Sequence, residues 1–195
     1  MLVVINAGHC PGVDSGACGD YSQEANIVKY VGEVVCKDLE AVGIQTMFVQ
    51  DDSLGYICRA ANSAGADLFI SIHCNAAGNR SAKGTETFYY AGSRKSEKLA
   101  QCIQKQLVDT MGTTDRGVKD GSGLYVLKHT AMPAVLTELA FISNPKEEKY
   151  LNEHKQVMAH AIARGITDYM NEVCIWETQL MVESCPKGCP ELKPS

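Results

Sequence analysis

The chain has 195 residues, of which 45% are hydrophobic and 21% are charged, and its formal net charge at pH 7 is -5. This length and balance are those of a single globular domain with a sizeable buried core. The charge lacks the basic excess that nucleic acid requires, and no apolar run approaches the roughly 18 to 20 residues that span a bilayer, so we expect neither a nucleic-acid partner nor membrane insertion.

The first part of the chain alternates strands and helices. Runs of β-branched apolar residues predict strands, and apolar residues that recur every three or four positions predict helices. Ser22 is the candidate N-cap of the first helix, and Gly43 is its stop. In chain order we expect a strand over residues 2–7, a glycine-rich loop over 12–20, a helix over 24–42, a strand over 44–49, a helix over 56–63 and a strand over 68–72.

The second part continues this alternation. Asn144 as cap, Pro145 in the first position and Glu147 reaching back to the cap predict a helix start. The other expected elements are a small-residue loop over 76–83, a strand over 85–90, a helix over 96–109, a polar surface loop over 111–123, strands over 124–128 and 134–139, and a helix over 155–172. This order predicts one α/β domain, residues 1–172, around a mostly parallel sheet, followed by a tail or linker root over 173–195.

Nine cysteines are scattered along the chain without the CxxC pairs of a structural zinc ribbon. An odd number cannot all pair within one chain, and we expect mostly reduced, buried thiols. Two pairings stay open as alternatives. One is a small disulfide between Cys185 and Cys189 in the tail, and the other joins Cys10 to Cys74.

Polar residues stand where the predicted strands end. His9 follows the first strand, His73 follows the strand over 68–72, and Glu138 closes the strand that begins at residue 134; Glu24 lies in the first turn of its helix. Ligands in such sheets bind outside the carboxyl ends of the strands. Two imidazoles and a carboxylate suit Zn²⁺ with a fourth position open, and a second carboxylate could act as general acid and base. From the residues alone, two interpretations are equally open. These residues could form a metal site, or they could be ordinary polar residues that close the strands.

Six segments in order resemble the zinc-dependent N-acetylmuramoyl-L-alanine amidases of the amidase-3 branch, which includes septal and sporulation amidases and phage endolysins. The resemblance covers about residues 2 to 171. The segments are Ile5–His9, Arg59–Asn62, Asp67–Ala76, Lys83–Thr87, Asp115–Lys119 and Pro133–Asn144.

The resemblance implies that His9, Glu24 and His73 hold one Zn²⁺ ion and that Glu138 is the catalytic residue. It implies a mixed, mainly parallel sheet of about six strands with helices on both faces. The reaction it implies is hydrolysis of the amide bond between the lactyl group of N-acetylmuramic acid and the L-alanine of the stem peptide in peptidoglycan.

Other residues near the predicted site are candidates for substrate contacts, each with a structural alternative. Asn75 lies two positions after His73, and Arg59 lies on a short helix where a structural salt bridge or a cap is the other role. Arg116 could bind a stem-peptide carboxylate or form a surface pair with Asp115. We expect Glu86, in the strand over 85–90, to be a hydrogen-bonded scaffold residue.

Two other functions remain open on the sequence. One is a zinc peptidase that cuts within the stem peptide, and the other is a non-catalytic wall-binding module that keeps the fold. The chain begins with an apolar strand rather than a signal peptide. We therefore expect an endolysin-like or truncated enzyme that stays cytoplasmic until it is released, with an autolysin of a bacterium as the other role. We also expect a monomer that acts on the peptidoglycan strands of the cell wall, outside the cell or in the periplasm.

Overall fold

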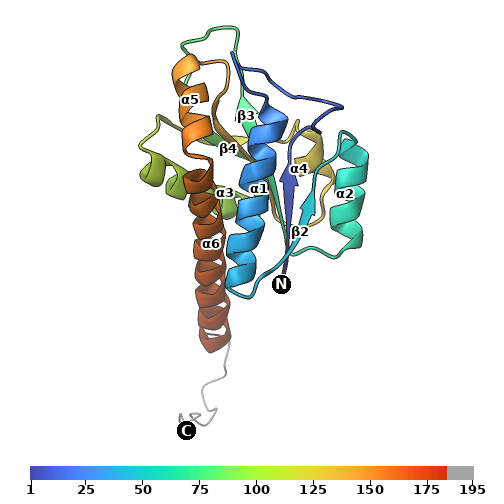
Figure 1. The fold of residues 1–195 in the computed structure, drawn as a ribbon. Coiled ribbons are helices and arrows are strands. Elements are labelled where there is room, and N and C mark those ends of the chain that lie inside the picture. Colours follow the sequence, from blue (N-terminus) through green and yellow to red (C-terminus); the bar gives the residue numbers. More distant parts are fainter. Residues whose placement is uncertain (184–195) are drawn as a thin grey trace.

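The computed structural model describes residues 1–183, with side chains described for residues 1–172. A sheet lies between layers of helices (Figure 1). The elements in chain order are β1 (Leu2–Ala7), α1 (Glu24–Ala41), β2 (Gln45–Val49), α2 (Leu54–Ser63), β3 (Leu68–Asn75), β4 (Thr85–Tyr89), α3 (Arg94–Met111), β5 (Asp115–Asp120), α4 (Tyr125–His129), β6 (Ala134–Phe141), α5 (Pro145–Glu153) and α6 (Lys155–Glu183). Among these helices none is long and apolar enough to cross a membrane.

The six strands form one sheet in the order β2-β1-β3-β6-β4-β5. The neighbours β2, β1, β3 and β6 run parallel, whereas β4 pairs with β6 in the antiparallel direction and with β5 in parallel. The expected mixed, mainly parallel sheet is confirmed. The carboxyl ends of β1, β3 and β6 therefore point to the same edge of the sheet.

Helices cover both faces of the sheet, as expected (Figure 1). Successive strand residues point to opposite faces, so a strand that is apolar throughout feeds two cores. In β3, Ile70 packs with α1, α3 and α6, whereas Phe69 packs with α2 and α4. Each of these two side chains is fully buried. The central strands therefore lie between two buried apolar layers.

One predicted strand, over residues 124–128, is wrong. These residues form most of α4. The rings of Tyr125 and His129 stack 3.9 Å apart, and Nδ1 of His129 lies 2.9 Å from the main-chain oxygen of Tyr125. These contacts join residues four positions apart, which is the spacing of neighbours on a helix. Five residues are too few to distinguish this spacing from a strand pattern.

The predicted surface loop over residues 111–123 contains the edge strand β5. Its residues are exposed or half-buried, and several are charged, so they lack the apolar alternation of a half-buried strand. Gly117 has φ of 77° where the register with β4 shifts, which is a backbone conformation that glycine adopts readily. Pairing with β4, rather than burial, makes this segment a strand.

The helix predicted from Asn144 begins as expected. The side-chain oxygen of Asn144 accepts the N–H of Lys146 at 3.0 Å, and Pro145 stands in the first turn. Glu147 does not reach back to the cap. It accepts the N–H groups of Gly84 at 2.8 Å and Phe141 at 2.7 Å, so it joins α5 to β6 and to the loop before β4.

The last helix, α6, runs on to Glu183 rather than ending near residue 172. The predicted domain boundary at residue 172 stays a prediction. Cys10 and Cys74 are free thiols, so the alternative disulfide between them is not formed. Cys185 and Cys189 lie outside the described residues.

Candidate metal centre

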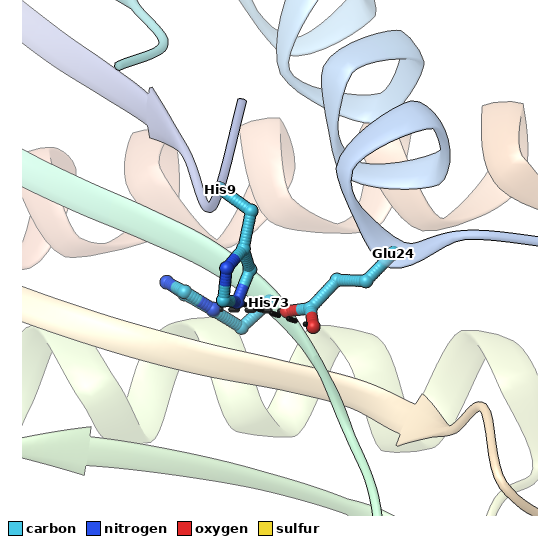
Figure 2. Close-up of side chains that lie close together, drawn as sticks. All are labelled: His9, Glu24 and His73. Atoms are coloured by element: carbon cyan, nitrogen blue, oxygen red, sulfur yellow. Dashed lines mark hydrogen bonds and ion pairs between the residues drawn. The ribbon is translucent and has the colours of Figure 1, made fainter. Parts of the chain in front are cut away.

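Three side chains from distant segments meet at the carboxyl edge of the sheet. His9 follows β1, Glu24 opens α1, and His73 lies within β3. Figure 2 shows the carboxylate of Glu24 beside the two imidazole rings. One nitrogen or oxygen atom from each residue lies within 4.8 Å of those of the other two. The structure therefore brings together the three residues that the sequence predicts as ligands.

Glu24 is the centre of this cluster, and its side chain is 3% exposed. Oε1 lies 2.9 Å from Nδ1 of His73 and accepts the N–H of Cys74 at 2.9 Å. Oε2 lies 3.3 Å from Nε2 of His9 and accepts the N–H of Ala17 at 2.9 Å. Burial raises the pKa of Glu24, but the hydrogen bonds with His73 and His9 outweigh it and hold this pKa well below its usual range. Glu24 is therefore an ionised carboxylate with one oxygen facing each histidine.

His9 is held in an uncommon backbone conformation, with φ of 60°, and among the described residues no other non-glycine has positive φ. Its Nδ1 lies 2.6 Å from Oδ2 of Asp14. The hydrogen bond with Glu24 raises the pKa of His9 to about 9; burial opposes this rise, and Asp14 adds to it. The sequence interpretation missed Asp14. The feature of the sequence that could have indicated Asp14 is its position, as a carboxylate in the glycine-rich loop that follows His9.

Two glycines leave room for the two rings. A Cβ atom on Gly8 would lie 2.2 Å from Cε1 of His73. A Cβ on Gly16 would lie 2.5 Å from Cδ2 of His9 and 2.7 Å from Oε2 of Glu24, and Gly16 also has φ of 64°. All three separations are far shorter than real contacts of a Cβ atom. The backbone therefore wraps closely around the cluster.

Glu138 lies beside His73, because β6 pairs with β3 in a register that matches these two residues. It lies within β6 rather than at its end. Its Oε2 is buried and has no hydrogen-bond partner among the described residues. Burial raises the pKa of Glu138 to about 7; His73 opposes this rise, and the charges of Glu24 and Glu86 add to it.

The residues present fit a zinc ion. Two imidazole nitrogens and a carboxylate oxygen can converge on one point, and this is a donor set that Zn²⁺ prefers. Buried polar atoms in native proteins are nearly always paired, so the orphaned oxygen of Glu138 beside this set indicates a missing partner. A substrate or water molecule at the centre would supply that partner.

A second polar cluster lies one strand further along the sheet, around Glu86, which pairs in register with Glu138. Oε1 of Glu86 accepts a hydrogen bond from Asn75 at 2.6 Å, and Oε2 lies 2.7 Å from Nε of Arg116 and also contacts the ammonium of Lys119. Glu86 is thus the hydrogen-bonded residue that the sequence predicts. It also brings Asn75 and Arg116 to one place beside Glu138.

Two alternatives from the sequence can be compared with these contacts. Oδ1 of Asp115 accepts a hydrogen bond from Gln104 at 2.7 Å, and Arg116 pairs with Glu86, so the surface pair of Asp115 and Arg116 is not formed. Arg59 is exposed on α2. Within residues 1–172, no described hydrogen bond or ion pair joins Arg59 to the three predicted ligands.

Known proteins match this chain over most of its length. The family described as N-acetylmuramoyl-L-alanine amidase (Amidase_3) matches residues 3–168. The N-acetylmuramoyl-L-alanine amidase LytC of Bacillus subtilis is 36% identical over 86% of this chain, which spans 35% of LytC. The endolysin of Bacillus phage SPP1 is 36% identical over 87% of this chain and 66% of its own length. The catalytic domain of CwlV, the amidase from Bacillus (Paenibacillus) polymyxa, has a TM-score of 0.80 and 34% identity, with 87% of this chain and 98% of that chain covered.

Proposed function

This chain belongs to the Amidase_3 family of N-acetylmuramoyl-L-alanine amidases, and we propose that it cleaves peptidoglycan with one bound Zn²⁺ ion and with Glu138 as the catalytic residue. The bond cleaved is the amide between the lactyl group of N-acetylmuramic acid and the L-alanine of the stem peptide. One observation carries the proposal. The His9, Glu24 and His73 cluster lies beside a buried carboxylate that has an unpartnered oxygen.

His9, Glu24 and His73 would hold the ion. Bound zinc supplies Lewis acidity, which polarises a carbonyl group and makes a water molecule easier to deprotonate. The protein keeps the donor atoms in place through the main-chain N–H groups of Ala17 and Cys74, which both bond to Glu24.

Glu138 would move the proton. Because burial raises the pKa of Glu138 to about 7, the carboxylate can accept a proton near neutral pH and give it up again. In the proposed reaction Glu138 takes the proton of the attacking water. It then delivers this proton to the alanine nitrogen as the amide bond breaks, which makes the amine a good leaving group.

The substrate would extend along the edge of the sheet from Glu138 towards Glu86. Asn75 and Arg116 are gathered at Glu86, next to Glu138, and the side chain of Arg116 is 35% exposed. We assign these two residues to the stem peptide, with Arg116 facing a carboxylate of the peptide. Arg59 on α2 stays a prediction.

The protein would act on the glycan–peptide strands of the cell wall as a monomer. The named relatives fit this location, since they include the amidase LytC and a phage endolysin.

The test is a digest of purified peptidoglycan, analysed by mass spectrometry with and without a chelator. We expect whole stem peptides that begin with L-alanine, no products with chelator, and recovery when Zn²⁺ is added back. Fragments cut within the stem peptide would identify a zinc peptidase instead. An intact wall under all conditions, with the protein bound to it, would identify a binding module.

A further inference from the structure

A fully buried carboxylate lies outside the metal centre and takes no part in the proposed chemistry. Glu148, in α5, is 0% exposed. Its Oε1 accepts the N–H groups of Tyr21 at 2.9 Å and Ser22 at 2.8 Å and the hydroxyl of Ser22 at 2.6 Å, while its Oε2 accepts the N–H of Asp20 at 2.8 Å. A buried charge is tolerated only when it is bonded this completely. Residues 20–22 are therefore fixed against α5.

The contact between this segment and α5 is close. A Cβ atom on Gly19 would lie 2.3 Å from the carboxyl carbon of Glu148, so only bare backbone fits there. Asn152, one turn further along α5, donates to the hydroxyl of Ser22 at 3.1 Å. Ser22, the predicted cap of α1, does not cap it; Gln23 occupies that position without a side-chain bond.

The same segment leads directly to a predicted metal ligand. The N–H of Gly19 donates to Ser22 at 3.0 Å, and the N–H of Glu24 donates to Ala17 at 2.9 Å. The N–H of Ala17 in turn donates to the carboxylate of Glu24 at 2.9 Å. Residues 17–24 thus form a closed loop whose tip rests on Glu148 and whose base carries the carboxylate of Glu24.

We propose that Glu148 is a positioning residue for the metal centre. By anchoring the tip of the 17–24 loop on α5, it holds the carboxylate of Glu24 where its two oxygens face His9 and His73. Because α5 follows β6 in the chain, the stretch that supplies Glu138 also fixes the loop that supplies Glu24. The inference rests on the proposed function, since it requires that His9, Glu24 and His73 bind zinc.

The experiment compares the zinc dissociation constants of the wild type, Glu148→Gln and Glu147→Gln by competition with a chromophoric chelator, at a temperature where all three are folded. Glu147 is the matched control, because it is the adjacent α5 carboxylate and accepts main-chain N–H groups from Gly84 and Phe141, away from the 17–24 loop. We expect Glu148→Gln to bind zinc about tenfold more weakly, which is typical of residues that orient metal ligands. We expect Glu147→Gln to bind as the wild type does.

The outcomes separate the two proposals. Equal zinc affinity in all three proteins would overturn the positioning role, even if Glu148→Gln unfolds at a lower temperature. Absence of zinc binding by the wild type would overturn the metal centre itself. If Glu148→Gln does not fold, Ser22→Ala removes one bond to the carboxylate and one to Asn152 but keeps the buried charge; it should weaken zinc binding by a smaller factor, and unchanged affinity would overturn the inference.

Discussion

Oδ2 of Asp14 lies 2.6 Å from Nδ1 of His9. The other ring nitrogen of His9, Nε2, faces Glu24. A carboxylate at one imidazole nitrogen keeps a proton there and leaves the second nitrogen for a metal ion. Asp14 is itself held by the N–H of Gly16 at 2.9 Å. The glycine-rich loop therefore selects which nitrogen of His9 is presented to the centre.

Replacing Asp14 with alanine should weaken zinc binding by about 10- to 100-fold, because the ring of His9 loses the partner that sets its orientation and its proton. Asp14→Asn should cost less, since its amide oxygen can still accept the proton on Nδ1. Competition with a chromophoric chelator measures the zinc dissociation constants of both variants. An Asp14→Ala protein with wild-type zinc affinity would show that the contact does not orient a ligand.

Glu138→Gln should lower kcat for peptidoglycan by about 10²- to 10⁴-fold, because glutamine cannot take up and return a proton. The variant should still bind one equivalent of zinc, measured by atomic absorption, since Glu138 is not among the three clustered donors. Near-normal wall lysis by a zinc-loaded Glu138→Gln protein would contradict the catalytic assignment.

Zinc affinity should depend on pH through His9. Its pKa is raised to about 9, so near neutral pH a proton must leave the ring before the ring nitrogen can bind a metal. Affinity should therefore rise by about tenfold per pH unit and level off above pH 9. Calorimetry in two buffers of different ionisation enthalpy should find about one proton released per zinc ion near pH 8. Binding without proton release would show that His9 is neutral in the free protein.

The metal-free protein should gain stability from Glu138→Gln at high pH. Burial raises the pKa of Glu138 from 4.5 to about 7, so the folded state binds this proton more tightly than the unfolded chain does. The stabilising contribution of the protonated group is complete below pH 4.5 and is lost as the pH rises through about 7. Relative to the wild type, the free energy of unfolding of the variant should increase by up to about 3 kcal/mol across this window. Urea unfolding of both proteins at several pH values measures it, and a constant difference would contradict the raised pKa.

The sequence was enough to predict that His9, Glu24 and His73 meet at one edge of the sheet. His9 and His73 follow the apolar runs of β1 and β3, Glu138 lies within β6, and the parallel order of these strands brings the three residues near one edge. The register between β3 and β6, which the strand order alone does not fix, then pairs His73 with Glu138. The roles of these residues in zinc binding and catalysis stay predictions until the metal and the kinetics are measured.

Other features could not be predicted from the sequence, because they depend on loops and long-range contacts. Glu148 bonds to residues 20–22, which precede it by 126 to 128 positions, and nothing in the periodicity of α5 distinguishes it from the neighbouring Glu147. Asp14 lies in a loop whose course is set by glycines rather than by a repeating pattern. Strand β5 also could not be predicted, because it is held by pairing at the edge of the sheet and its residues are not buried.

The absence of a side chain at Gly8 and Gly16 matters when the metal site of a homologue is judged from its sequence. A homologue may keep two histidines and a glutamate at the ligand positions and still have a side chain at either glycine. Because a methyl group at either position would overlap the ring of His73 or His9, that ring would have to move from the position it has here. The two glycines are thus as much a part of this donor arrangement as the three clustered side chains.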